Sequence, residues 1–252
     1  MKQTIQEKLT HIAHTEPLHF LLAVESGSRA WGFASPDSDY DVRAIYIRPQ
    51  PYYLQIDEAK DTFEFIENQW FDVGGWDIRK ALRLLRKSNA TLLEWLRSPM
   101  VYTQDDDFTG RLNALAPQYV QAAALLHHYR GIAGNALKAM DLAQPVKLKK
   151  WFYVLRPLLA ARWAVKQGGI PPMTLAELMS EWQTDCAAQI ADLVAIKTKQ
   201  DESYLHTLSP ELQRLTVDLY NEVSELSAPA AQAADSGPLN ELFRETLAAV
   251  NG

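Results

Sequence analysis

Hydrophobic and polar positions change their period several times in the first hundred residues, which predicts short strands separated by turns and helices. Residues 19–24 (HFLLAV) form an apolar run of strand length, and residues 41–47 (DVRAIYI) are rich in β-formers. Residues 61–66 and 69–73 carry weaker strand signals. Residues 4–15 are expected to form an opening helix. This part of the chain is therefore predicted to hold a small mixed sheet.

The pattern becomes helical after Trp76. The apolar positions then recur at helical spacing, and Asp77 stands where a helix N-cap is expected. Asn89 is expected to mark another helix boundary. Two Thr-x-x-Glu capping boxes and one Ser-Pro start predict further helices, at Thr91–Glu94, Thr174–Glu177 and Ser209–Pro210.

These patterns together predict an α+β fold. Residues 1–104 are expected to form a small mixed β-sheet domain with helices, and residues 105–252 an all-helical domain. Residues 228–238 (APAAQAADSGP) have the composition of a flexible loop, and an amphipathic helix is expected to follow them.

One short stretch combines the features of a phosphate site and a metal site. Gly27 and Ser28 follow the first predicted strand, and a glycine there lets backbone amides approach a phosphate while the serine adds a hydroxyl donor. Ten residues separate Ser28 from Asp39, and Asp39 and Asp41 stand at the entry to the next predicted strand. Residues two apart on a strand face the same side, and two such carboxylates favour a hard cation such as Mg²⁺.

Composition narrows the setting of this chemistry. The chain has 252 residues, with 47% hydrophobic and 22% charged residues, and no apolar stretch of membrane-spanning length. Its only cysteine, Cys186, excludes an internal disulfide, so a cytoplasmic protein without a membrane segment is expected. The net charge is −6, yet residues 138–166 carry a local charge of +6. Such a basic segment indicates either a local anion site or a solvated helix face.

Gly-Ser followed by Asp-x-Asp at this spacing resembles the signature of polymerase-beta-like nucleotidyltransferases. Within them, the chain looks like the YcgL/RlaP family of predicted nucleotidyltransferases. The resemblance rests on GSRAWG at 27–32, SDYDVR at 38–43, WDIRKALRLL at 76–85 and SNATLLEWL at 88–96. In the helical half only LRPLLAARW at 155–163 contributes.

The resemblance implies a third carboxylate on a neighbouring strand and two divalent ions, Mg²⁺ or Mn²⁺, held by Asp39, Asp41 and Asp72. Asp77 and Glu64 remain alternatives to Asp72 as the third ligand. The implied reaction is attack of an acceptor hydroxyl on the α-phosphate of a nucleoside triphosphate, with the two ions clamping the reacting groups.

Further residues are expected to bind the nucleotide. Gly27 and Ser28 are assigned to its phosphates, and Arg43 has the same strand parity as the aspartates. One helical face carries Lys149, Tyr153 and Arg156. These residues are expected to form either a phosphate site or a stripe of solvent-exposed side chains.

The acceptor stays open at this point. The resemblance implies RNA repair or modification, with an RNA end as acceptor. A partner protein modified by adenylylation is an alternative, as is a small molecule, and a non-catalytic nucleotide-binding module is a further one. The sequence predicts neither the preferred nucleotide nor the oligomeric state.

Overall fold

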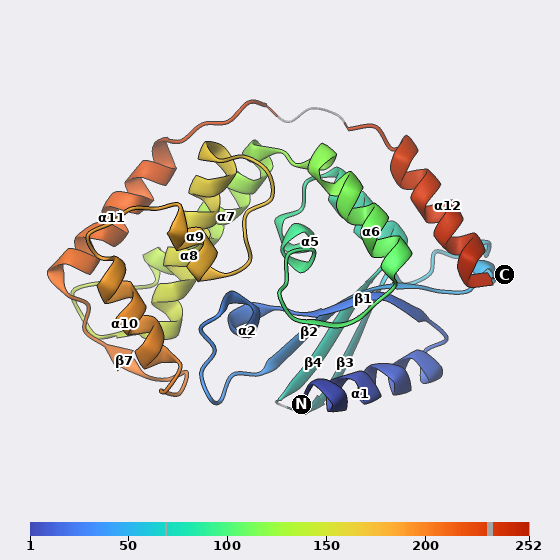
Figure 1. The fold of residues 1–252 in the computed structure, drawn as a ribbon, viewed down its shortest axis with the longest axis horizontal. Coiled ribbons are helices and arrows are strands. Elements are labelled where there is room, and N and C mark those ends of the chain that lie inside the picture. Colours follow the sequence, from blue (N-terminus) through green and yellow to red (C-terminus); the bar gives the residue numbers. More distant parts are fainter. Residues whose placement is uncertain (69, 231–233, 252) are drawn as a thin grey trace. The chain divides into compact units, whose positions relative to one another are not determined.

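A computed structural model describes residues 1–68, 70–230 and 234–251 (Figure 1). The chain divides into two compact units, each assembled from separate stretches. The first unit comprises Met1–Ser26, Asp39–Tyr119 and Ala233–Gly252, and the second comprises Gly27–Ser38 and Val120–Gln232. The predicted domain boundary between residues 104 and 105 stays a prediction, since these units describe compactness and not function.

The first unit is built on a mixed sheet, which among the described residues has five strands. They are β1 (His19–Glu25), β2 (Tyr40–Ile47), β3 (Thr62–Asn68), β4 (Phe71–Asp77) and β5 (Val101–Gln104), in the order β3-β4-β2-β1-β5. β2 and β4 pair in parallel, whereas the other neighbours pair antiparallel. The parallel pair brings together residues that are 31 positions apart in the chain, such as Asp41 and Asp72.

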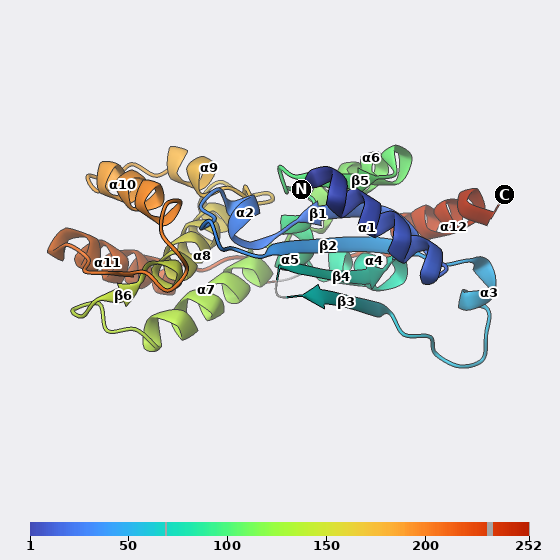
Figure 2. The ribbon, with the colours of Figure 1, turned by 90° about the horizontal axis from the view of Figure 1, so that it is seen from below.

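The alternation of side chains gives this sheet two different faces. Helix α1 (Lys2–Thr15) lies along one face, where Ile5, Leu9 and Ile12 are buried (Figure 2). β2 contributes Val42, Ala44 and Tyr46 to this core. The intervening residues of β2 point to the opposite face because side chains alternate along a strand. That opposite face therefore carries the candidate functional side chains.

Short helices complete the first unit. They are α3 (Gln50–Tyr53), α4 (Ile78–Arg86), α5 (Ala90–Trp95), α6 (Asp106–Leu115), the 3₁₀ turn Ala116–Tyr119 and α12 (Gly237–Asn251). Asp77 caps α4 by accepting a hydrogen bond from the Arg79 amide, as the sequence predicts. The start predicted at Thr91 is wrong, because the Asn89 side chain caps α5 two residues earlier and places Thr91 inside the helix.

The second unit is almost entirely helical. It holds α2 (Gly27–Trp31), α7 (Ala122–Lys138), α8 (Leu148–Lys166), α9 (Leu175–Ser180), α10 (Ala187–Lys197) and α11 (Pro210–Glu225). Two two-residue strands, β6 (Val146–Lys147) and β7 (Leu205–His206), pair with each other. α7 packs along α8, whose buried side chains surround most of its circumference. The predicted α+β class with a helical C-terminal part is confirmed.

Local signals in the helical region also behave as predicted. Thr174 and Glu177 form the reciprocal hydrogen bonds of a capping box, and Ser209 caps α11 ahead of its proline. The strand signal at residues 69–73 begins outside the described residues, and β4 starts at Phe71. The predicted loop 228–238 includes residues 231–233, which also lie outside them.

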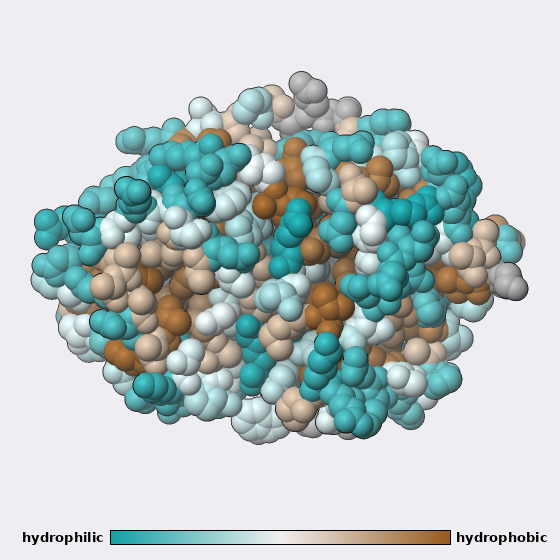
Figure 3. All heavy atoms as spheres, viewed as in Figure 1, coloured by the Kyte–Doolittle hydropathy of each residue, from teal (hydrophilic) through white to brown (hydrophobic). Residues whose placement is uncertain are grey.

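On the face drawn in Figure 3, hydrophilic residues are spread widely and apolar residues occupy smaller separate areas. Within the part of the chain that the structure describes, no helix has the length and apolar character needed to cross a membrane.

Candidate active site

Asp41 and Asp72 meet on the sheet face opposite α1. They are register partners on the parallel strands β2 and β4. Arg43, two residues along β2, has the same orientation as Asp41 and points its guanidinium between the two carboxylates. Its Nη2 lies 3.1 Å from Asp41 Oδ1 and 2.7 Å from Asp72 Oδ2. All three side chains remain between about a quarter and two fifths exposed, so the pair is accessible from solvent.

The Asp41 and Asp72 carboxylates both contact Arg43 Nη2, so a cation is stabilised between them. Carboxylate oxygens are the donors that Mg²⁺ and Mn²⁺ prefer, so Asp41 and Asp72 fit a divalent ion at the position Arg43 now neutralises. Asp39 precedes β2 and is exposed. Among the described residues, no group of three or more His, Cys, Asp or Glu side chains is assembled for a metal. Metal binding by Asp39 therefore stays a prediction.

The two alternatives for the third carboxylate occupy different environments. Asp77 is 1% exposed, accepts hydrogen bonds from the Tyr53 hydroxyl and the Arg79 amide, and caps α4. Burial raises the pKa of Asp77, although these hydrogen bonds oppose the shift. Glu64 is exposed on β3, paired in register with Gly74. Of the three candidates, Asp72 is the one in direct register with Asp41.

A fully buried glutamate supports the backbone of Asp41. Glu25 ends the apolar strand β1 and is 0% exposed. Its Oε1 accepts a hydrogen bond of 2.9 Å from the Asp41 amide, and its Oε2 accepts one from the Tyr102 hydroxyl. The Ser26 amide in turn donates to the Asp41 carbonyl at 2.8 Å. Sequence reasoning missed Glu25, although a carboxylate at the end of an apolar strand, next to Gly27, was an available signal.

The glycine and serine of the motif lie at the start of α2 in the second unit. Gly27 has φ = +62°, a left-handed conformation that favours glycine. The Ser28 hydroxyl is buried and donates to the Ser38 hydroxyl at 3.2 Å. Ser38 also accepts from the Ser35 amide and donates to Glu202 at 2.9 Å. A phosphate role for Gly27 and Ser28 stays a prediction.

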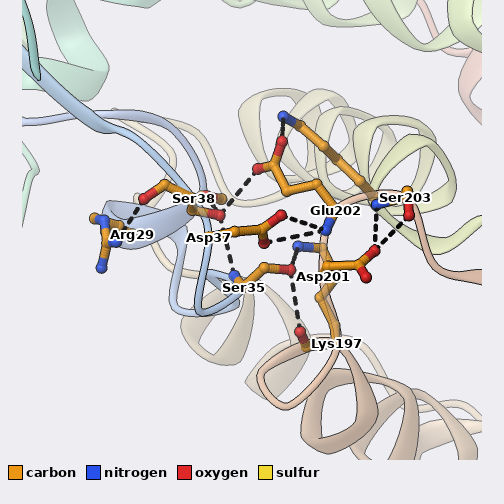
Figure 4. A network of polar contacts seen from close by, with 10 residues as sticks. Arg29, Ser35, Asp37, Ser38, Lys197, Asp201, Glu202 and Ser203 are labelled. Carbon is orange, nitrogen blue, oxygen red and sulfur yellow. Dashed lines mark hydrogen bonds and ion pairs between the residues drawn. The ribbon is translucent and has the colours of Figure 1, made fainter. Parts of the chain in front are cut away.

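The loop that precedes Asp39 is tied to residues 197–203 by a polar network (Figure 4). Both carboxylate oxygens of Asp37 accept from the Glu202 amide, at 3.1 and 3.2 Å. The fully buried Lys197 ammonium donates to the Ser35 hydroxyl, and burial lowers the pKa of Lys197. These contacts join segments more than 160 residues apart within the second unit, so no local sequence signal predicts them.

The three predicted nucleotide contacts on α8 have unlike surroundings. Lys149 is paired with Glu202. Tyr153 and Lys149 line a cavity of about 750 Å³, which Lys147 and Lys150 also border. Arg156 is instead 1% exposed, donates from Nε to the Met173 carbonyl at 3.0 Å, and lies 4.6 Å from the Trp31 ring centroid. Their binding of a nucleotide stays a prediction, and for Arg156 it would require leaving this buried position.

The geometry and the motif agree with what comparison with known proteins shows. Residues 1–245 match the model of the RNA repair pathway DNA polymerase beta family, so the chain belongs to this family. Membership of this family indicates a polymerase-beta-like nucleotidyltransferase and supports transferase activity at this general level. Nucleotidyltransferases of this superfamily usually use divalent metals.

The chain is also similar to individual known proteins. The chain is 41% identical over 204 residues to a protein of Bacillus subtilis (strain 168) named "Uncharacterized protein YcgL", covering 80% of this chain and 78% of that one. A crystal structure of a nucleotidyltransferase-like protein from Exiguobacterium sibiricum aligns with 99% of this chain and 90% of its own, at 12% identity and a TM-score of 0.33. The latter likeness is too low to support an argument.

Proposed function

We propose that this protein transfers a nucleoside monophosphate from a nucleoside triphosphate to a hydroxyl at the end of an RNA. The observation that carries the proposal is the convergence of Asp41 and Asp72, from adjacent parallel strands, on one cationic nitrogen. The family's description as one of RNA repair supports the choice of acceptor.

The proposed site uses Asp39 and Asp41 on the nucleotide side and Asp72 on the acceptor side. Two divalent ions bound there would neutralise the reacting oxygens and the leaving pyrophosphate. Asp72 accepts the proton of the acceptor hydroxyl or orients it. The hydroxyl oxygen forms a bond to the α-phosphorus, the bond from that phosphorus to the bridging oxygen breaks, and pyrophosphate leaves. From the motif, Gly27 and Ser28 are assigned to the phosphates.

Arg43 has a separate role in this proposal. Its guanidinium holds Asp41 and Asp72 together while no divalent ion is bound, because unpaired carboxylates at this distance would repel each other. When the ions bind, the guanidinium is available to a phosphate oxygen, with which arginine forms charge-assisted hydrogen bonds. This deepens the sequence-based assignment of Arg43 to nucleotide binding.

The test is a transfer assay with four labelled nucleoside triphosphates, Mg²⁺ or Mn²⁺, and a panel of RNA ends and proteins. Asp39→Ala and Asp41→Ala should each abolish transfer together with any Mg²⁺-dependent rise in melting temperature. Asp72→Asn should abolish transfer and retain triphosphate binding. The matched control is Asp192→Asn, an exposed carboxylate on α10, which should change neither.

Three results would count against this assignment. If Glu64→Gln abolishes transfer and Asp72→Asn does not, the third carboxylate is Glu64. If the wild type labels a protein and none of the RNA ends, the transferase class survives and the RNA acceptor is wrong. Transfer that persists in Asp41→Ala overturns the proposed site altogether.

A further inference from the structure

A cavity of about 430 Å³ opens on the same sheet face as Asp72. Residues of strands β2, β3 and β4 and of helix α5 line it. Among the described residues that line it, Asp72 and Arg43 are present, whereas Asp39 and Asp41 are not. The cavity therefore adjoins the acceptor-side carboxylate of the proposed reaction. Its volume lies within the range of pockets that take small ligands.

The cavity contains an aromatic platform. Trp76 of β4 is half-buried and lines it. Its ring stacks on that of Trp95 from α5, with centroids 4.0 Å apart and planes 28° from parallel. Trp95 is 3% exposed, so packing holds the second ring and thereby fixes the orientation of the first. A rigid, partly exposed indole is a surface on which nucleobases stack, and such stacking accepts any base.

The floor of the cavity is kept open by a glycine that packing does not require. At Gly75, a Cβ would lie 2.1 Å from the Phe63 ring, so the core on the α1 side excludes every larger residue. At Gly74, which faces the cavity, the nearest atom to a Cβ is Arg43 Nη1 at 3.6 Å, an ordinary contact distance. Internal packing thus accounts for a glycine at position 75 but not at position 74. A glycine at position 74 instead leaves space in the cavity for a ligand.

Polar groups at the border complete a site for a nucleoside. Lys60 supplies a cation, Glu64 supplies a carboxylate in addition to Asp72, and Thr62 and Thr91 supply hydroxyl groups. Lys60 is exposed, as a contact to a neighbouring phosphate requires. An apolar platform, hydroxyl groups and cations are the groups that bind a base, a ribose and a backbone phosphate, respectively.

We propose that this cavity, the Trp76 pocket, binds the terminal nucleoside of a single-stranded RNA acceptor. The base stacks on Trp76, and the ribose hydroxyl that will be extended lies at the Asp72 end. This inference rests on the proposed function, because it identifies the acceptor side of the same site.

The first test is equilibrium binding of a short single-stranded RNA, labelled at its 5′ end and carrying a 3′ hydroxyl, followed by fluorescence anisotropy without nucleotide. Trp76→Ala should weaken binding about ten-fold, which corresponds to the loss of one stacked base. Trp182→Ala is the matched control, because Trp182 is also partly buried but lies beyond α9 in the second unit. It should leave RNA binding unchanged.

A second variant separates loss of the pocket from loss of the fold. Gly74→Leu fills the cavity, keeps both tryptophans and begins from a Cβ position with ordinary space. It should weaken RNA binding at least as much as Trp76→Ala at an unchanged melting temperature. A 4-thiouridine at the 3′ end of the RNA should cross-link to peptides of β4 or α5. If both variants bind RNA as the wild type does, or if the cross-link maps elsewhere, the proposal is wrong.

The binding and transfer assays distinguish failure of this inference from failure of the proposed function. If RNA occupies the pocket but no nucleotide is transferred to any acceptor, the inference stands and the proposed reaction falls. If transfer to a protein is unaffected by Trp76→Ala and Gly74→Leu, and RNA does not bind, nucleotidyl transfer stands and the Trp76 pocket is not its RNA acceptor site.

Discussion

Replacing Glu25 by glutamine should impair the active site from a position that touches no substrate. In the wild type, the Glu25 carboxylate accepts one hydrogen bond from the Asp41 amide and one from the Tyr102 hydroxyl. Hydrogen bonds to a charged group contribute about 1.5–3 kcal/mol each. Glutamine keeps the size but offers only one oxygen, so it can serve one of these two donors and loses the charge for both. We therefore expect Glu25→Gln to lower the free energy of unfolding by about 2 kcal/mol.

The functional consequence concerns the position of Asp41. When the hydrogen bond to the Asp41 amide weakens, the Asp41 carboxylate, three bonds from that nitrogen, loses part of its fixed orientation towards Asp72. Partners that orient metal ligands typically account for about 10–100-fold in metal affinity or activity. The Mg²⁺ concentration at the midpoint of the melting-temperature rise should therefore increase about ten-fold in Glu25→Gln. Transfer should fall by a similar factor, and added Mg²⁺ should restore part of it.

Tyr102→Phe is the control for this prediction. It removes the second hydrogen bond of Glu25 and leaves the Asp41 amide paired, so it should cost about 1–2 kcal/mol of stability without shifting the Mg²⁺ midpoint. Stability is measured by urea denaturation, and the Mg²⁺ midpoint by thermal melting. An equal shift of the midpoint in both variants, or no shift in Glu25→Gln, would refute the positioning role of Glu25.

Two further outcomes follow from the second unit. Burial alone would raise the pKa of Glu202, but hydrogen bonds from Lys149 and Ser38 outweigh burial, and the pKa is lowered. The ionised Glu202 side chain therefore stabilises the fold above the ordinary glutamate pKa, and this contribution is lost as pH falls through the lowered pKa. Between about pH 5 and pH 3, the wild type should lose more stability than Glu202→Gln in urea denaturation, and parallel curves would contradict this. Arg156→Ala should lower the free energy of unfolding by about 2–4 kcal/mol because it removes a buried side chain. Arg162→Ala should lower it by about 1 kcal/mol or less, because the Arg162 side chain is 21% exposed. Equal losses would show that burial does not decide the effect.

Sequence patterns predicted the elements that carry their own periodicity. The apolar run before Glu25 formed β1, and the alternation after Tyr40 formed β2 with Arg43 on the same side as Asp41. Asp77 was identified as a helix cap because a cap depends only on its immediate neighbours. Asn89 and Thr91 are both residue types that cap helices, and only the backbone conformation shows that Asn89 is the N-cap of α5. Local sequence patterns thus predict a helix cap correctly where only one capping residue is present.

Pairings between distant segments lay beyond those rules. The parallel register that sets Asp72 beside Asp41 joins residues 31 positions apart in the chain, and the choice of Asp72 came from resemblance. The bond from Lys197 to Ser35 spans 162 positions. Neither lysine nor serine carries a sequence signal for such a contact, because both residue types are ordinarily exposed. Burial of Lys197 is visible only once the helices are packed.

The charge balance at the sheet face connects these observations. Asp41, Asp72 and Arg43 together carry one net negative charge, so the folded protein needs no bound ion to keep the two carboxylates adjacent. A divalent ion that replaces the guanidinium leaves no net charge on the carboxylate pair and releases a cation beside it. An incoming polyphosphate would then find both the metal and a free guanidinium, which are complementary to its charge. Binding of metal and nucleotide should therefore be coupled, each strengthening the other, and Arg43→Gln should reduce that coupling because glutamine cannot neutralise either partner.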